Sequence, residues 1–286
     1  MDWGAISEIY VPYKDGNLWL EPLSQAVEFL NSKGVDGFFV NGVGAEALPL
    51  SLDEKKRVLE KVLERSKNKI IIQNITEYKL EKVLELAKHA KDSGASHLLI
   101  SQHPVYSLSN YLLFYKKVSE KVELPIILYN EKLLGQIFSP AQVSAILSLD
   151  NFVGYKDSTR DISHTQEVLE LMPKGKDLIA GSDSMIYVTY ALGGKGIVSL
   201  VINPFPELVV DIVKQLKDKN YNKAFESQLK INRVREILKS YGFSAGYREA
   251  CRIREIECGE PYNKLEALNE KQKDELRQKL TLEGLI

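Results

Sequence analysis

Cysteine is scarce in this 286-residue chain, which contains only Cys251 and Cys258. Both fall within a helical pattern that we predict from Ala245 to Cys258, where they would lie two turns, or roughly 10 Å, apart. A disulfide requires Cα atoms closer than that. We therefore expect two free thiols and a reducing compartment.

Histidine is rare as well, and its four positions show neither the HxH nor the HExxH spacing of a catalytic metal site. The histidines are His89, His97, His103 and His164. We expect no metal and no other cofactor.

An excess of charge of one sign is also absent, because 38 Lys and Arg residues stand against 39 Asp and Glu residues. This balance gives no electrostatic preference for nucleic acid or for an anionic membrane surface. No apolar run reaches the ~18 residues of a membrane span, and the first residues lack a basic stretch followed by an apolar one. We expect a cytoplasmic protein that binds neither nucleic acid nor membrane.

The chain does contain short apolar runs rich in β-branched residues, most of them followed by a helical pattern. The predicted strands span residues 5–11, 36–40, 69–74, 97–101, 125–129, 152–156, 177–180 and 196–201. The intervening helices are predicted at residues 21–33, 51–67, 78–92, 109–122, 139–149, 161–171 and 184–192. Ser51-Leu52-Asp53-Glu54 is typical of a capping box and places the start of the second helix.

Eight strand–helix units predict an α/β fold, the parallel (β/α)8 TIM barrel, for which about 250 residues is typical. A doubly wound open sheet has the same alternation and is the competing architecture. Only helical patterns follow, over residues 206–219, 221–241, 245–258 and 270–280. We predict a catalytic barrel over residues 1–219 and a C-terminal helical domain over residues 220–286.

The ends of two neighbouring predicted strands carry the candidate catalytic residues, because the active site of a parallel barrel is built at the carboxyl ends of its strands. Lys156 ends the sixth strand, where burial would disfavour the ammonium form and make the amine a nucleophile for a ketone. Tyr129 ends the fifth, where its phenol could pass a proton to that amine. The alternatives are a solvated lysine beyond the strand and a tyrosine of the core with a satisfied hydroxyl.

Two loops at the same end contain candidate binding residues. Gly42 and Gly44, after the second strand, allow backbone amides to approach an anion such as a carboxylate. Gly181 and Ser182 follow the seventh strand. They either bind a polar substrate tail or phosphate, or form an ordinary helix N-cap.

These motifs together resemble those of the Schiff-base pyruvate lyase superfamily, which includes N-acetylneuraminate lyase, dihydrodipicolinate synthase and the archaeal 2-keto-3-deoxygluconate aldolases. The run from Gly154 to Ser158 is similar to the family's G-[IV]-K-D-[ST] lysine motif. The resemblance covers the whole chain. Further similar segments are Tyr129-Asn130 for Y-N, Asn41-Gly42, Pro104-Val105-Tyr106 for P-Y-Y, Gly181-Ser182-Asp183 for G-S-D, and Gly193 to Ser199.

The resemblance implies a homotetramer of (β/α)8 barrels, each with a C-terminal helical domain. It implies that Lys156 forms an imine with pyruvate or another 2-keto acid and that Tyr129 relays protons. Tyr106 would complete this relay, reaching across a subunit interface. Substrate binding is implied for Val43, Gly44, Ala45, Gly181, Ser182 and Val198.

The loop after the second strand departs from the family's G-T-T-G pattern. Val43 and Gly44 replace both threonines, and Ala45 replaces the last glycine. The hydroxyls that bind the keto-acid carboxylate and continue the proton relay are therefore absent. No arginine occurs where dihydrodipicolinate synthases hold the carboxyl end of their second substrate, which counts against that reaction.

We predict a class I aldolase, a lyase of carbohydrate metabolism that cleaves a 2-keto-3-deoxy sugar acid to pyruvate and an aldehyde, or catalyses the reverse condensation. Dihydrodipicolinate synthase is the enzymatic alternative. The loop substitutions support a further hypothesis, a catalytically weakened barrel that binds keto acids and assembles with a catalytic paralogue.

Overall fold

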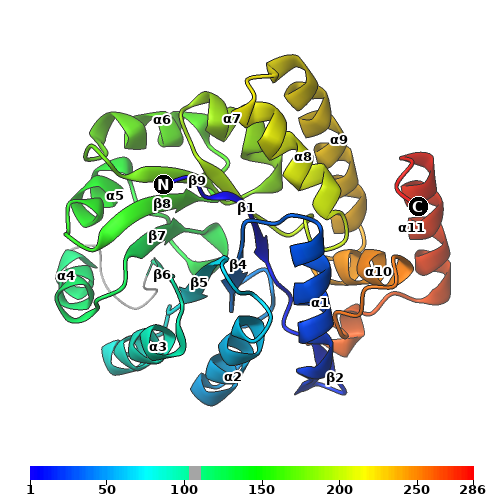
Figure 1. Cartoon of the computed structure of the whole chain (residues 1–286), viewed down its shortest axis with the longest axis horizontal. Helices are drawn as coiled ribbons and strands as arrows, with labels where there is room; N and C mark the ends of the chain where they lie inside the picture. The colour runs from blue at the N-terminus through cyan, green and yellow to red at the C-terminus, as the bar shows by residue number, and fades with distance from the viewer. Residues whose placement is uncertain (103–110) are drawn as a thin grey trace.

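The computed structural model describes residues 1–102 and 111–286. Its parallel strands close into a barrel in the order β1-β10-β9-β8-β7-β6-β5-β4, with helices around the outside (Figure 1). The barrel is closed because β1 pairs with both β4 and β10. The predicted (β/α)8 fold is therefore confirmed, and the open-sheet alternative is wrong. The barrel strands are β1 (Gly4–Glu8), β4 (Gly37–Val40), β5 (Ile70–Asn74), β6 (His97–Ser101), β7 (Ile126–Asn130), β8 (Phe152–Asp157), β9 (Asp177–Ala180) and β10 (Gly196–Ser199).

A small antiparallel hairpin, β2 (Tyr13–Lys14) and β3 (Asn17–Leu18), follows β1 and turns at Asp15 and Gly16. Helices then cover the barrel between successive strands. They are α1 (Glu21–Ser32), α2 (Leu52–Leu63), α3 (Leu80–Ser93), α4 (Tyr111–Lys121), α5 (Pro140–Leu147), α6 (Ile162–Leu171), α7 (Ile186–Ala191) and α8 (Pro206–Lys217).

Helix α2 shows how local sequence sets an element's start. The Ser51 hydroxyl accepts the Glu54 backbone N–H, and the Glu54 carboxylate accepts the Ser51 backbone N–H at 2.8 Å. The predicted capping box is therefore present. The helix ends at Leu63, four residues short of the predicted end at residue 67.

The C-terminal helices are α9 (Tyr221–Lys239), α10 (Ala245–Ile253) and α11 (Glu270–Leu282). Helix α9 packs on α8, α10 packs on α9, and α11 contacts both α9 and α10. Figure 1 shows α11 at the edge of the molecule, away from the barrel strands. The boundary between a barrel and a C-terminal domain at residue 219 stays a prediction.

The two cysteines lie closer together than the sequence predicts. Helix α10 ends at Ile253, so Cys258 lies beyond it on a segment that turns back toward the helix. Both cysteines are free and buried, and the segment after the helix brings Cys258 back beside Cys251, while Cys258 Sγ donates to the Arg248 carbonyl at 3.7 Å. The expected separation of two helical turns is therefore wrong, because the helical pattern continues past the end of the helix itself.

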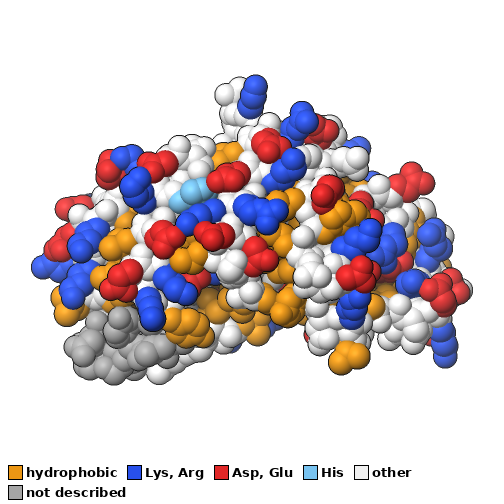
Figure 2. All heavy atoms as spheres, turned by 90° about the horizontal axis from the view of Figure 1, so that it is seen from below, with side chains coloured by type: hydrophobic (Ala, Val, Ile, Leu, Met, Phe, Trp, Pro, Cys, Tyr) orange, Lys and Arg blue, Asp and Glu red, His pale blue; other side chains and the backbone are white. Residues whose placement is uncertain are grey.

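The surface carries charges of both signs. On the face in Figure 2, Lys and Arg side chains are interspersed with Asp and Glu, and neither sign gathers into one large patch there. Among the described residues, no helix combines the length and the apolar composition needed to cross a bilayer.

The barrel interior is filled by apolar side chains from alternate strand positions, as this architecture requires. At the amino ends of the strands, the Trp3 and His97 rings meet edge to face with centroids 4.7 Å apart. The Trp3 indole N–H donates to Asp177 at 3.0 Å. These side chains close the end of the barrel opposite the candidate site. The interior cluster comprises Trp3, Ile6, Phe39, Ile72, Leu99, Ile127, Tyr129, Ile179 and Val198.

The buried position of His97 predicts acid sensitivity. Burial lowers the pKa of His97 from 6.5 to about 4. The unfolded chain therefore takes up a proton as the pH falls through 6.5, whereas the folded protein does so only near pH 4. We expect the free energy of unfolding to decrease as the pH falls from 6.5 to 4, and His97→Gln to flatten this decrease in urea titrations. Equal pH slopes for both proteins would contradict this assignment.

Candidate active site

Strands β7 and β8 place Tyr129 and Lys156 beside each other at the carboxyl end of the barrel, because the two residues are register partners in the parallel ladder. The Lys156 side chain is fully buried. Its Nζ lies 3.6 Å from the centroid of the Tyr129 ring and 4.7 Å from that of Phe39. The alternative of a solvated lysine beyond the strand is therefore wrong.

The environment of the Lys156 amine favours its uncharged form. Its Nζ has no hydrogen-bond partner among the described residues, and the Glu8 carboxylate oxygen Oε2 lies 3.8 Å away. Burial lowers the pKa of Lys156, and the negative charges of Glu8, Glu131 and Asp183 oppose this effect without cancelling it. A buried amine of this kind is a nucleophile for a carbonyl carbon.

Tyr129 stands in a short chain of hydroxyl and carboxylate groups. Its hydroxyl donates to Glu131 Oε2 at 2.7 Å and accepts from the Ser158 hydroxyl at 3.3 Å. Burial raises the pKa of Tyr129 well above its ordinary value, with a further contribution from Glu131. The phenol therefore stays protonated and is positioned to exchange a proton with Glu131.

Glu8, the last residue of β1, is held by the loop that follows β4. Its Oε1 accepts the Ala45 backbone N–H at 3.2 Å. Burial raises the pKa of Glu8, while Lys156 and the amides of Gly44 and Ala45 lower it by a smaller amount. A carboxyl group of the protein itself therefore occupies an amide of the loop that the sequence assigns to a substrate carboxylate.

A cavity of about 410 Å³ opens beside these groups. Five of the predicted substrate-binding residues line it. The sixth, Ala45, is fully buried, and its backbone amide donates to Glu8. Lys156 is not part of the cavity wall, because it lies behind Tyr129 and Glu8, which are. Tyr106, the third predicted catalytic residue, lies outside the described residues. The five lining residues are Val43, Gly44, Gly181, Ser182 and Val198.

The rest of the cavity wall combines apolar side chains, among them Leu133, Leu200 and Phe243, with several cations. Lys132, Arg160, Arg235 and Lys239 contribute the positive charges, and they come from loops after β7 and β8 and from α9. Positive charges lining a cavity raise the local concentration of anionic ligands.

Sequence reasoning missed Glu8, Glu131 and Arg160 as residues of this site. The sequence does single out Glu8 as a candidate site residue, because it is the only charged residue within the apolar run at positions 5–11. Glu131 follows the tyrosine motif directly, but the spacing alone does not show that its carboxylate bonds the phenol. No group of three or more His, Cys, Asp or Glu side chains in the described ranges is arranged to hold a metal ion.

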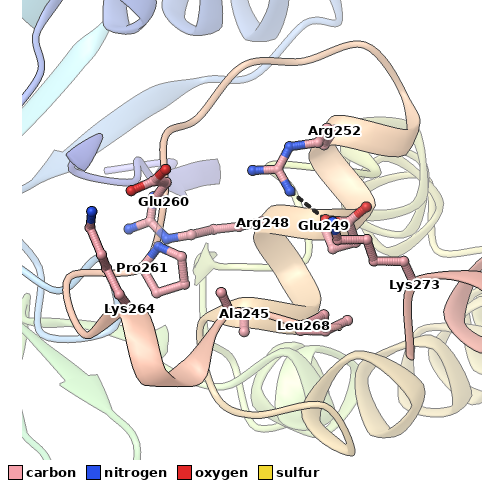
Figure 3. A pocket seen from close by; sticks show the side chains of 10 residues that line it. Ala245, Arg248, Glu249, Arg252, Glu260, Pro261, Lys264, Leu268 and Lys273 are labelled. Atoms are coloured by element: carbon pink, nitrogen blue, oxygen red, sulfur yellow. Dashed lines mark hydrogen bonds and ion pairs between the residues drawn. The ribbon is translucent and has the colours of Figure 1, made fainter. Parts of the chain in front are cut away.

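A second cavity, of about 430 Å³, lies between α10 and the segment leading to α11 (Figure 3). It contains none of the predicted site residues. Arg248 lines it and is almost fully buried. The Arg248 guanidinium donates to Glu46 Oε2 at 2.6 Å and to the Val11 carbonyl at 3.0 Å. Because Glu46 follows Ala45 directly, this C-terminal helix anchors the loop that holds Glu8.

Comparisons with known proteins show the family of this chain. The family model described as the dihydrodipicolinate synthetase family matches residues 3–283, and the chain belongs to this family. Its members are lyases, and this protein is therefore a lyase.

Individual relatives cover most of the chain. An uncharacterised DapA-like lyase of Pyrococcus furiosus is 29% identical over 90% of this chain and 88% of its own. A 4-hydroxy-tetrahydrodipicolinate synthase of Methanothrix thermoacetophila is 31% identical over 78% and 77%. The structure of a Sulfolobus 2-keto-3-deoxygluconate aldolase has a TM-score of 0.88 at 24% identity, covering 97% of this chain and 95% of that one. This last similarity shows the shared fold.

The Arg248–Glu46 ion pair yields a stability prediction. Arg248→Met leaves the carboxylate of Glu46 without its guanidinium in a largely buried position, and we expect the free energy of unfolding to fall by about 3 kcal/mol. Adding Glu46→Gln removes the second charge and should recover part of the loss. Urea denaturation of the single and double variants checks this. A single variant within about 0.5 kcal/mol of the native protein, as for an ordinary surface substitution, would contradict it.

Proposed function

We propose that this lyase is a class I aldolase that cleaves a 2-keto-3-deoxy sugar acid to pyruvate and an aldehyde, or forms it from them. The observation that supports the proposal most directly is the Lys156 amine, buried without a hydrogen-bond partner beside the Tyr129 ring. An uncharged amine can attack the keto carbon and form an imine, which then accepts electrons from the breaking C–C bond. No cofactor is needed for this reaction.

In this mechanism the substrate enters through the cavity and approaches Lys156 past Glu8 and Tyr129. We propose that the phenol of Tyr129, bonded to Glu131, takes the hydroxyl proton of the sugar acid when the C–C bond breaks and returns it in the reverse direction. Tyr106 is proposed to complete this relay from a neighbouring subunit of a homotetramer.

The cations of the cavity support an anionic substrate. Lys132, Arg160 and Lys239 supply positive charge on the side of the cavity opened by the loops after β7 and β8 and by α9. We propose that the substrate contacts the same cavity through Gly181, Ser182 and Val198, and through Val43 and Gly44 of the loop after β4. The enzyme is proposed to act in the cytoplasm.

Dihydrodipicolinate synthase activity is the second candidate, favoured by the name of the Methanothrix relative. Against it, the residues after Asn130 are Glu131, Lys132 and two leucines, with no arginine to hold a second carboxyl group. Turnover of aspartate semialdehyde with pyruvate in a coupled assay distinguishes this reaction from cleavage of sugar acids.

A catalytically weakened paralogue is the third candidate, based on the missing threonines at positions 43 and 44. The structure supplies a reason for glycine at position 44 other than decay. A Cβ atom there would lie 2.7 Å from Leu200 Cδ1 and 2.9 Å from Glu8 Oε1, so the side chain of Leu200 or of Glu8 would have to move. We therefore expect Gly44→Thr to lower activity, measured as sugar-acid cleavage, whereas a weakened enzyme would gain turnover.

Trapping with borohydride tests the proposed function. Pyruvate plus borohydride should add irreversible mass to the native protein at one lysine, Lys156, and Lys156→Met should abolish the addition. The matched control is Lys55→Arg, because Lys55 is also largely buried but is paired with Glu77 at 2.5 Å. An intact mass that pyruvate and borohydride leave unchanged would contradict the proposal.

A further inference from the structure

We propose that Glu8 is a catalytic acid and base in imine formation at Lys156, a role that rests on the function proposed above. Its carboxyl group lies between the amine and the loop after β4, and its side chain is 6% exposed. It lines the cavity through which the carbonyl substrate arrives. No other carboxylate oxygen of the described chain lies within 4.0 Å of Lys156 Nζ.

The loop after β4 is shaped around the Glu8 side chain. A Cβ atom on Gly42 would lie 2.2 Å from Glu8 Oε1, and one on Gly44 would lie 2.9 Å from the same oxygen. Any side chain at either position would displace the carboxyl group. Both glycines of this loop therefore provide space for Glu8, which explains why the glycines occur together with a glutamate at the end of β1.

The two oxygens of Glu8 have different surroundings. Oε1 accepts the Ala45 amide, which fixes the carboxyl group, while Oε2 faces the amine at 3.8 Å. The arrangement leaves Oε2 free to exchange a proton at the nitrogen or at the oxygen of an adduct on it.

Lys156 and Glu8 together can carry out the proton transfers that imine formation requires. Burial disfavours the charged form of each partner, and in the proposed step the amine reacts in its neutral form while Glu8 carries the proton. The amine nitrogen forms a bond to the keto carbon, and the carbonyl oxygen gains the proton that the nitrogen loses. Glu8 then donates its proton to the departing hydroxyl, water leaves, and a protonated imine remains beside the Glu8 carboxylate.

This step conserves charge within the site. A neutral amine, an uncharged keto group and a neutral acid become a cationic imine, an anionic Glu8 carboxylate and water, while the substrate's own carboxylate keeps its charge, and no further reactant is required. Hydrolysis of the imine runs the same proton transfers backwards. Glu8 thereby supplies the proton transfer that hydroxyl groups at positions 43 and 44 would otherwise perform.

Other titratable groups surround this pair and must be considered when pH dependence is measured. Lys156 faces Glu8 from β8, Tyr129 and Glu131 lie on and just after β7, and Asp183 lies beyond β9 near Lys156. The Tyr129 hydroxyl donates a hydrogen bond to Glu131, and the Ser199 hydroxyl donates one to Asp183. Substitution of Glu8 alone therefore separates its contribution from theirs.

Glu8→Gln is the principal test, because glutamine keeps the size of the side chain and can accept the Ala45 amide but cannot transfer a proton. We expect rapid-quench borohydride trapping of pyruvate at Lys156 to slow by at least about a hundredfold. We also expect the native decline in trapping rate at high pH, where Glu8 loses its proton, to disappear. An unchanged rate and pH profile in Glu8→Gln would overturn the proposal.

Glu8→Ala provides a second test that does not depend on the glutamine variant folding well. The missing carboxyl group leaves space beside the amine, and added formate should restore trapping in proportion to its concentration, whereas chloride at equal ionic strength should not. Failure of formate to accelerate a folded Glu8→Ala protein, verified by circular dichroism, would count against Glu8 as the acid.

The control is Glu77→Gln, which removes a carboxylate from a different, largely buried lysine pair. It should trap pyruvate at the native rate. The outcomes separate the two proposals. A native protein that is not labelled at Lys156 overturns the proposed aldolase, whereas native labelling with an equal rate in Glu8→Gln overturns only the role of Glu8.

Discussion

The withdrawal of one amine from water is the constraint on which the rest of this site depends. Lys156 is fully buried at the carboxyl end of β8, over two aromatic rings and without a hydrogen bond. Burial of a lone ammonium ion is costly, and the cost is relieved when the amine gives up its proton. The closed barrel makes this possible, because β7 and β9 flank β8 and exclude solvent from both sides.

The groups around the amine accommodate this constraint in different ways. Tyr129 covers the amine with its ring and directs its hydroxyl toward Glu131. Glu8 reaches the amine from the other side, and its own burial favours the protonated acid. The C-terminal helix α10 contributes at a distance, since Arg248 fixes Glu46 and with it the loop that holds Glu8.

The sequence predicted the barrel and the Lys156–Tyr129 pair because both depend on local patterns. Strand–helix alternation determines the fold, and equivalent positions at neighbouring strand ends become neighbours in space. Glu8 was missed because its partners lie on a loop about 37 positions away and on β8, contacts that no periodicity encodes. The cysteine contact was missed for a related reason, because the helical pattern runs past the end of α10 at Ile253. The substrate-binding assignment of the loop at residues 43–45 rested on its glycines, which here make room for a side chain of the protein.

Titration of the Lys156 side chain tests the central claim most directly. NMR spectra of protein carrying ¹³C at the lysine Cε positions, with the Lys156 resonance assigned by its loss in Lys156→Met, report the protonation of this amine. The account predicts a pKa for Lys156 below the ordinary value of 10.5. A resonance that titrates at or above that value would show that burial does not disfavour the ammonium form of Lys156, and would contradict the account.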